Sequence, residues 1–491
     1  MKGSDVKLKI NNKKFLIAVL ISSLLFSSYS ISATNKKTDG ATTMVKTNKN
    51  IVLNNFKVHY HPKTGWMNDP NGLSFNGKNY NMFYQYYPSD TVWGPMHWGH
   101  AISNDLIKWE EQRIALYPDH LGMNFSGSAV IDKDNTSGFF NKNTPVEKRE
   151  VIVYTSHYEQ DGKREEMQSV AYLSDNGNYK RYENNPVIAG NGRKDFRDPK
   201  IFYYEKDKKW VMIVSAAQKA ELYESKNLKD WKKLSDFNYD FKFKHIWECP
   251  DLIQVDGKWI LVGSIINEDD RINGKVLYFV GEFDGKKFTP DENKYEVLDY
   301  GRDFYAPQSI YGAKKPTAIA WLNNWVYATK IPAKDFRSIM GIPRVMSFKN
   351  GKLYQEKVDT FKNYITNKKD IKNADTMGQN VYFDLQNTGN FDLELFKDAN
   401  GSFNLSYKDG KLRVKREKFG SFSFNDKDLD RQFLDDVTVD IDLKKVNIVV
   451  DSNVIEIFAN DGEKTFSYLV YPDNYNYKFS GDVKGSIYEI K

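Results

Sequence analysis

Cysteine is nearly absent from the sequence. The 491 residues include one cysteine, Cys249. A single cysteine cannot form an intramolecular disulfide, and it excludes the CxxC motifs of zinc and redox sites. His97 and His100 have the spacing of metal ligands, but without a nearby Glu or Cys partner a packing role is favoured. We therefore expect no metal site.

The sequence also lacks an apolar run long enough to span a membrane. The N-terminal run at residues 15–26 is shorter than the roughly 20 residues that a transmembrane helix needs. Lysines precede it and small residues follow it, which is typical of a secretory signal peptide. We expect residues 1–33 to be a signal peptide, residues 34–50 to be a disordered lead, and the mature protein to be secreted. An uncleaved membrane anchor is the alternative.

Long runs of one charge are missing as well. The 71 Lys and Arg and the 65 Asp and Glu leave a net charge of +6, and the lysines are scattered along the chain. This distribution indicates no nucleic-acid partner. A hydrophobic content of 40% with 28% charged residues is typical of a globular protein.

Helical periodicity is scarce after residue 56, whereas short runs rich in β-branched and aromatic residues are common. Aromatic residues make up 15% of the chain, which favours strands and flat surfaces that stack on ligands. Asn-Gly and Asp-Gly dipeptides are typical of hairpin turns, and they separate the runs at residues 76–77, 256–257, 284–285, 350–351 and 409–410. We predict an all-β protein.

A weak internal repeat runs through the first part of the chain. Residues 103–109, SNDLIKW, resemble residues 225–231, SKNLKDW. Five repeat units begin near Asp69, Ser128, Asp198, Asp251 and Asp303. Their size is that of a four-stranded propeller blade. We predict a five-bladed β-propeller over residues 51–348, followed by a linker and a C-terminal β-sandwich over residues 349–491. A pair of sandwiches is the alternative.

Three acidic residues stand in unusual polar turns at the starts of repeat units. They are Asp69 in WMNDPNG, Asp198 in FRDPK and Glu248 in WECPD. The first strand of each blade lines the central channel of a propeller, so we expect the three side chains to converge. Each Asp-Pro turn taken alone is more often structural.

Converging carboxylates suit the cleavage of a glycosidic bond, which needs a nucleophile or base and an acid. The apolar neighbours of Glu248 predict a raised pKa and a protonated acid. Amide donors beside Asp69 predict an ionised carboxylate. Arg197 is expected to clamp sugar hydroxyls while Asp198 stays anionic.

Eight motifs in this order resemble glycoside hydrolase family 32, which comprises invertases, inulinases and levanases. They are GWMNDPNG, YQYYP, WGPMHWGH, FSGSAV, FRDPK, WECPD, GRDFYAPQ and WLNNW, and a ninth stretch, VDSNVIEIFANDGEKTFS, resembles the family's C-terminal sandwich. The resemblance implies a five-bladed propeller with a sandwich and retaining hydrolysis of β-D-fructofuranosides without a cofactor.

The same resemblance implies residue roles. Asp69 would be the nucleophile, Glu248 the general acid/base and Asp198 the stabiliser of the transition state. The implied substrate contacts are Trp66, Met67, Asn68, Gln85, Trp93, Phe125, Ser126, Arg197, Trp321 and Trp325. Pro307 and Gln308 depart from the family pattern, and we expect them near the rim of the pocket.

The sequence thus predicts a secreted β-fructofuranosidase that acts on levan, inulin or sucrose. Levan against inulin, exo against endo attack, transfructosylation and polysaccharide binding by the sandwich stay open. The alternatives are an inverting arabinan- or xylan-cleaving propeller glycosidase and a noncatalytic sugar-binding propeller.

Overall fold

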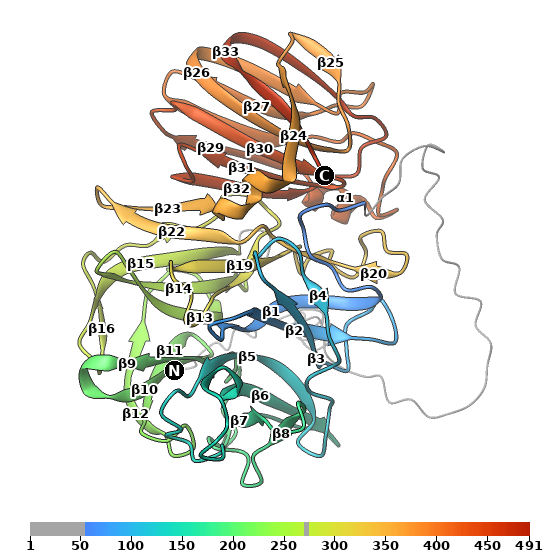
Figure 1. Cartoon of the computed structure of the whole chain (residues 1–491). Helices are drawn as coiled ribbons and strands as arrows, with labels where there is room; N and C mark the ends of the chain where they lie inside the picture. The colour runs from blue at the N-terminus through green and yellow to red at the C-terminus, as the bar shows by residue number, and fades with distance from the viewer. Residues whose placement is uncertain (1–54, 270–273) are drawn as a thin grey trace, which may run out of the picture. The chain divides into compact units, whose positions relative to one another are not determined.

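The computed structural model describes residues 55–269 and 274–491. The protein is 54% strand and 4% helix, and it consists of a five-bladed β-propeller and a C-terminal β-sandwich (Figure 1). This confirms the predicted fold class. None of the helices in the described ranges is both long and apolar enough to cross a membrane. The expected signal peptide and lead lie outside the described residues.

Each blade is an antiparallel sheet whose strands follow one another along the chain. Blade 1 contains β1 (Gly65–Phe75), β2 (Tyr80–Tyr87), β3 (His97–Ser103) and β4 (Glu110–Glu111). Blade 2 contains β5 (Met123–Ile131), β6 (Glu150–Gln160), β7 (Lys163–Leu173) and β8 (Tyr179–Arg181). Blade 3 contains β9 (Lys200–Tyr204), β10 (Lys209–Ala216), β11 (Lys219–Ser225) and β12 (Lys232–Asn238).

The last two blades carry short additional strands. Blade 4 contains β13 (His245–Val255), β14 (Lys258–Asn267), β15 (Lys275–Phe283), β16 (Phe288–Pro290) and β17 (Glu296–Val297). Blade 5 contains β18 (Tyr305–Ser309), β19 (Thr317–Leu322), β21 (Ile339–Met340), β22 (Arg344–Lys349) and β23 (Lys352–Lys357). Strand β20 (Phe336–Arg337) lies between β19 and β21 along the chain and pairs in parallel with β1. This pairing joins the last blade of the propeller to the first.

Buried apolar clusters join each blade to the next. Pairs that share a cluster are Trp98 with Ile152, Val151 with Met212, Ile213 with Leu261, Val262 with Ala320, and Ile319 with Met82. Because every blade packs on two neighbours, the first strands surround one common axis.

An irregularity recurs on the first strands of the blades. The register shifts between Met67 and Pro70 in β1, Asn124 and Gly127 in β5, Glu248 and Asp251 in β13, and Tyr305 and Gln308 in β18. A bulge bends the strand and redirects its side chains. Proline tolerates such positions because no ladder hydrogen bond is lost there. The sequence accordingly has Pro or Gly at positions 70, 127, 199, 250 and 307.

The sandwich is built from ten strands around its own core. They are β24 (Ile365–Asp370), β25 (Ala374–Thr376), β26 (Asn380–Leu395), β27 (Phe403–Lys408), β28 (Lys411–Arg416), β29 (Asp435–Asp440), β30 (Lys445–Asp451), β31 (Val454–Ala459), β32 (Lys464–Leu469) and β33 (Asn476–Ile490). The long strand β26 pairs with β27, β30 and β33. Helix α1 (Lys427–Phe433) begins at Asp426, whose side chain accepts from the backbone N–H groups of Asp428 and Leu429.

The propeller sheet extends beyond the expected boundary at residues 348 and 349. Strand β23, which follows that boundary, pairs along its whole length with β22 of blade 5. The polar stretch that suggested a linker contains β24, β25 and a 3₁₀ helix, Asp359–Tyr364. The chain therefore passes directly from the last blade into the sandwich.

Buried ion pairs join the propeller and the sandwich. Arg344 of blade 5 donates to Oδ2 of Asp299 at 2.9 Å and to Oε2 of Glu456 at 2.5 Å. Arg416 of β28 donates to Oδ2 of Asp303 at 2.5 Å, and both side chains are fully buried. Removing one partner of such a pair leaves an uncompensated buried charge.

Candidate active site

The three acidic residues come from different blades and meet around Cys249. Asp69 lies on β1, Asp198 immediately before β9, and Glu248 on β13. The sulfur of Cys249 lies 3.6 Å from Oδ2 of Asp69 and 3.5 Å from Oδ2 of Asp198. The backbone N–H of Cys249 also donates to Oδ2 of Asp198 at 2.9 Å. The structure thus brings together side chains that are far apart in the sequence.

Unusual backbone conformations orient this group. Asp198, Cys249 and Ala306 have φ values of 66°, 47° and 49°. Non-glycine residues rarely adopt the left-handed region, and such strain concentrates at functional sites. Cys249 and Ala306 lie at the register shifts of β13 and β18, and all three residues directly precede a proline. The backbone therefore turns these side chains towards the axis.

Asp69 is held by two side-chain donors. Nδ2 of Asn68 donates to its Oδ1 at 3.0 Å, and Oγ of Ser126 donates to its Oδ2 at 2.7 Å. Burial nevertheless raises the pKa of Asp69 above its ordinary value of 3.8, because these hydrogen bonds only partly oppose the desolvation. The sequence predicts that the neighbouring amide donors hold Asp69 in the ionised form. The raised pKa shows that these donors do not fully offset the effect of burial.

Glu248 does not lie in the apolar environment that its sequence neighbours predict. Its Oε1 accepts from Nη2 of Arg197 at 2.9 Å, and its Oε2 accepts from the hydroxyl of Tyr305 at 2.5 Å. The apolar neighbour Trp247 points the other way, into a buried cluster, since side chains alternate along a strand. The predicted apolar setting of Glu248 is therefore wrong.

Asp198 and Arg197 also differ from expectation. Burial raises the pKa of Asp198 to about 8, although Arg197 opposes the shift. The raised pKa of Asp198 therefore does not support the expected permanent anion. Arg197 directs Nη1 to Asp195 at 2.7 Å and to Glu166 at 3.2 Å. Both terminal nitrogens of Arg197 thus bind carboxylates of the protein, and the clamp on sugar hydroxyls stays a prediction.

Aromatic side chains form one wall of the site. Trp325 is 40% exposed and lies against Trp66 and Trp321, with ring centroids 6.1 Å and 4.8 Å away. Trp66 and Trp321 have no exposed surface, so they support Trp325 from behind. Trp93 is partly buried and meets the edge of Phe125 at 5.8 Å.

Two further predicted contacts are buried in the floor of the site. Nε2 of Gln85 donates to the carbonyl of Asn124 at 2.9 Å, and Oδ1 of Asn68 accepts from the indole of Trp66 at 2.7 Å. Met67 has no exposed surface and belongs to the cluster between blades 5 and 1. Its predicted substrate contact must be corrected, because its side chain packs in the core.

Gln308 and Pro307 line a small cavity at the site. Oε1 of Gln308 accepts from the backbone N–H of Leu73 at 3.2 Å, and its Nε2 donates to the carbonyl of Gly127 at 2.9 Å. The cavity is also lined by Ser126, Asp198 and Cys249. Gln308 therefore links blade 5 to blades 1 and 2.

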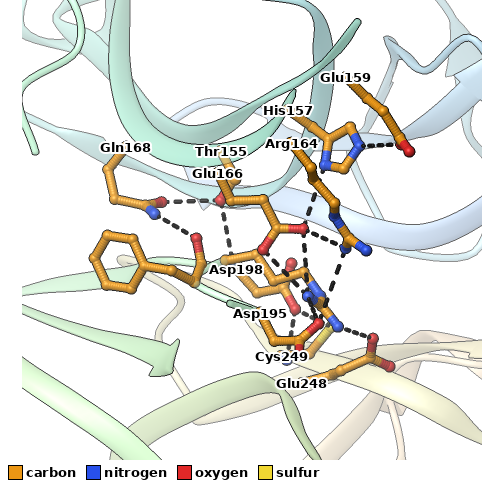
Figure 2. A network of polar contacts seen from close by, with 12 residues as sticks. Thr155, His157, Glu159, Arg164, Glu166, Gln168, Asp195, Asp198, Glu248 and Cys249 are labelled. Carbon is orange, nitrogen blue, oxygen red and sulfur yellow. Dashed lines mark hydrogen bonds and ion pairs between the residues drawn. The ribbon is translucent and has the colours of Figure 1, made fainter. Parts of the chain in front are cut away.

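The sequence did not single out several residues of this site. Tyr305 lies in the GRDFYAPQ motif, two positions before Pro307, and this spacing could have identified it. Glu166, Asp195 and His157 carry no such signal. Their contacts with Arg197 and with one another are seen only in the fold (Figure 2).

The described residues contain no group of three His, Cys, Asp or Glu side chains that could hold a metal ion. Nδ1 of His97 contacts the carbonyl of Pro95, and Nε2 of His100 contacts the side chain of Asn81. The chemistry that the site offers is thus that of paired carboxyl groups beside aromatic surfaces, as in glycoside hydrolysis.

Comparison with known proteins agrees with this geometry. The family model described as "Glycosyl hydrolases family 32 N-terminal domain" matches residues 59–357, and that described as "Glycosyl hydrolases family 32 C terminal" matches residues 350–486. A levanase of Bacillus subtilis is 37% identical over 459 residues, which cover 85% of this chain and 66% of the levanase. An extracellular exo-inulinase of Meyerozyma guilliermondii is 34% identical, covering 83% of this chain and 88% of that protein.

The fold also matches a solved structure. The crystal structure of exo-inulinase from Aspergillus awamori aligns with a TM-score of 0.79 at 30% identity and covers 89% of this chain and 98% of that one. The two family models together span most of the described residues. The chain therefore belongs to glycosyl hydrolase family 32.

Proposed function

We propose that this protein is a β-fructofuranosidase that releases fructose from the ends of fructans, levan or inulin, and from sucrose. The observation that supports this most strongly is the meeting of Asp69, Asp198 and Glu248 around Cys249. The relatives named levanase and exo-inulinase support fructans as substrates. Sucrose carries the same β-fructosyl group at the bond to be broken.

The proposed reaction is a double displacement that retains the anomeric configuration. The carboxylate of Asp69 attacks C2 of the fructosyl unit, and Glu248 donates its proton to the leaving oxygen. In the second step Glu248 removes a proton from water, which attacks C2 and releases Asp69 and fructose. Each carboxyl group thus returns to its starting protonation state at the end of the cycle.

Asp198 is assigned to the sugar hydroxyls. Its raised pKa means that it can donate as well as accept a hydrogen bond near neutral pH. A donor or acceptor that binds the ring hydroxyls more tightly in the transition state lowers the barrier. The partly exposed Trp325 offers an apolar face against the furanose ring.

We further propose that the enzyme is secreted. The predicted signal peptide and the extracellular exo-inulinase relative support this location. Polymeric fructans cannot enter a cell, so an enzyme that degrades them has to act outside it. We also propose that the sandwich domain binds such polysaccharides. Gel retardation of the full chain in levan or inulin tests that binding.

Chromatography of the products from sucrose, inulin and levan tests the proposed activity. Fructose alone in the early reaction supports exo attack, whereas oligosaccharides indicate endo attack. Release of arabinose or xylose from arabinan or xylan, with no fructose, would favour the alternative glycosidase. Binding without turnover of any of these sugars would favour a noncatalytic lectin.

A further inference from the structure

A buried carboxylate outside the predicted catalytic set lies directly behind Arg197. Glu166 of β7 is 1% exposed. Its Oε2 lies 3.2 Å from Nη1 of Arg197, and its Oε1 accepts from Arg164 at 2.8 Å. Nδ1 of His157 lies 3.2 Å from the same Oε1. Figure 2 shows Glu166 between His157 and Arg164 on one side and Asp198 and Glu248 on the other.

Arg197 connects Glu166 to Glu248. Its Nη1 contacts Glu166 and its Nη2 donates to Glu248 at 2.9 Å. The guanidinium is planar and rigid, so fixing one terminal nitrogen also fixes the direction of the other. Glu166 and Asp195 together hold Nη1, and this sets where Nη2 meets Glu248.

We propose that Glu166 is a positioning residue that acts on Glu248 through Arg197. This inference rests on the proposed function of Glu248 as the acid/base. Glu166 orients the guanidinium of Arg197 and partly compensates its positive charge. The electrostatic effect of Arg197 on Glu248 is thereby reduced. This arrangement fixes the position of Arg197 against the carboxyl group that is proposed to act as the acid.

The charges around the two carboxyl groups support this division. Glu166 faces Arg197, Arg164, His157 and, across Arg197, Asp195. Glu248 faces Arg197, Tyr305, Asp69, Asp198 and the thiol of Cys249. Arg197 is the only cation that belongs to both of these sets. A change of charge at Glu166 therefore affects Glu248 by way of Arg197.

Glu166 acts as a fixed negative charge. Burial alone raises the pKa of Glu166, but Arg197 and the hydrogen bonds from His157 and Arg164 outweigh burial and lower it well below its ordinary value. The residue therefore stays ionised over the pH range in which a glycosidase works. Its effect on the reaction comes from position and charge and does not require it to exchange a proton.

The isosteric substitution Glu166→Gln tests the proposal, with the full chain and sucrose. It keeps the shape but removes the charge, leaving Arg197 to favour the ionised form of Glu248. We expect kcat to fall about tenfold or more. The alkaline limb of the kcat/KM profile should move to lower pH by about one unit, while KM changes little.

Glu159→Gln is the matched control. Glu159 contacts the other ring nitrogen of His157 at 3.2 Å, is 42% exposed in its side chain, and lies at the outer end of the same network. Among the described residues Glu159 contacts His157 and not Arg197, so its variant should keep the wild-type profile. A purely structural role for the network predicts that both variants lower the unfolding temperature without moving the pH profile.

A second variant decides the case if Glu166→Gln does not fold. Glu166→Asp keeps the charge but withdraws it from Arg197, so we expect a lower kcat with an alkaline limb near that of the wild type. A folded Glu166→Gln or Glu166→Asp protein with wild-type kcat and pH profile overturns the proposal. Wild-type protein that releases no fructose from sucrose instead refutes the proposed function itself.

Discussion

The hydroxyl of Tyr305 donates to Oε2 of Glu248 at 2.5 Å. Burial and the charge of Glu248 raise the pKa of Tyr305 well above its ordinary value, so this hydroxyl stays protonated and remains a donor. It therefore stabilises the ionised form of Glu248, as Arg197 does from the other oxygen.

Replacing Tyr305 by Phe should change the pH profile in the direction opposite to Glu166→Gln. The loss of one hydrogen bond to a charged group costs about 1.5–3 kcal/mol, so Glu248 should keep its proton to higher pH. We expect the alkaline limb of kcat/KM to move upward and kcat to fall about tenfold to a hundredfold. Tyr182→Phe, on the outer part of blade 2, is the control and should leave both quantities unchanged.

Ser126→Ala should move the acidic limb of kcat/KM to higher pH. Ser126 donates to the ionised form of Asp69 at 2.7 Å, and burial already raises the pKa of Asp69 above 3.8. Losing the donor raises the pKa of Asp69 further, because one hydrogen bond to the ionised carboxylate is removed. Ser128→Ala is the matched control, since Ser128 lies on the same strand and donates to the carbonyl of Pro199. Equal acidic limbs in the two variants would remove Ser126 from this role.

Asp198→Asn should raise stability more at pH 8 than at pH 4. The pKa of Asp198 is raised from 3.8 to about 8, mainly by burial. A raised pKa in the folded state contributes stability that is full below pH 3.8 and is lost as the pH rises through about 8. Asparagine does not ionise, so the variant does not lose stability as the pH rises. We also expect its turnover to fall. Thermal unfolding at both pH values measures the difference, and an equal change at the two would contradict the assigned cause.

Arg416→Met should destabilise the junction between propeller and sandwich. It leaves Asp303 buried without its cation, which costs about 3–5 kcal/mol. The double variant with Asp303→Asn should recover part of this loss, because no buried charge then remains unpaired. Denaturant unfolding followed by tryptophan fluorescence measures both. A single variant as stable as the wild type would show that the pair does not stabilise this junction.

Asp69→Ala should abolish turnover and leave the fold intact. Removal of a catalytic nucleophile commonly costs three or more orders of magnitude in kcat. The side chain is held only by the local donors Asn68, Ser126 and the thiol of Cys249, so its loss should change the unfolding temperature little. Fructose release from sucrose and circular dichroism are the two measurements, and an active variant would exclude Asp69 as the nucleophile.

Much of the fold could be predicted from local sequence patterns. Hairpin dipeptides and alternating apolar residues define the strands, and the repeat length defines the blades. Three of the bulges are also indicated by the sequence, because Asp69, Cys249 and Ala306 precede prolines at the register shifts of β1, β13 and β18. This regularity explains why the meeting of the three acids could be predicted.

The electrostatics of the site could not be predicted in the same way. Trp247 and Pro250 suggested an apolar pocket for Glu248, yet the residues that contact its oxygens, Arg197 and Tyr305, come from other blades. Asp303 lies two residues before β18, near the predicted start of the fifth repeat unit, and its carboxylate binds Arg416 of the sandwich, a contact that the sequence does not indicate. The local sequence indicates the position of a residue on its strand. The partners of its side chain depend on contacts between segments that are distant in the sequence.

The configuration of the first fructose released from sucrose tests the proposed reaction most directly. Proton NMR during the first turnovers, before mutarotation, distinguishes the two furanose anomers. A double displacement through Asp69 predicts that β-D-fructofuranose is formed first. Initial release of the α anomer would contradict it, because water would then have attacked C2 directly and Asp69 could not have been the nucleophile.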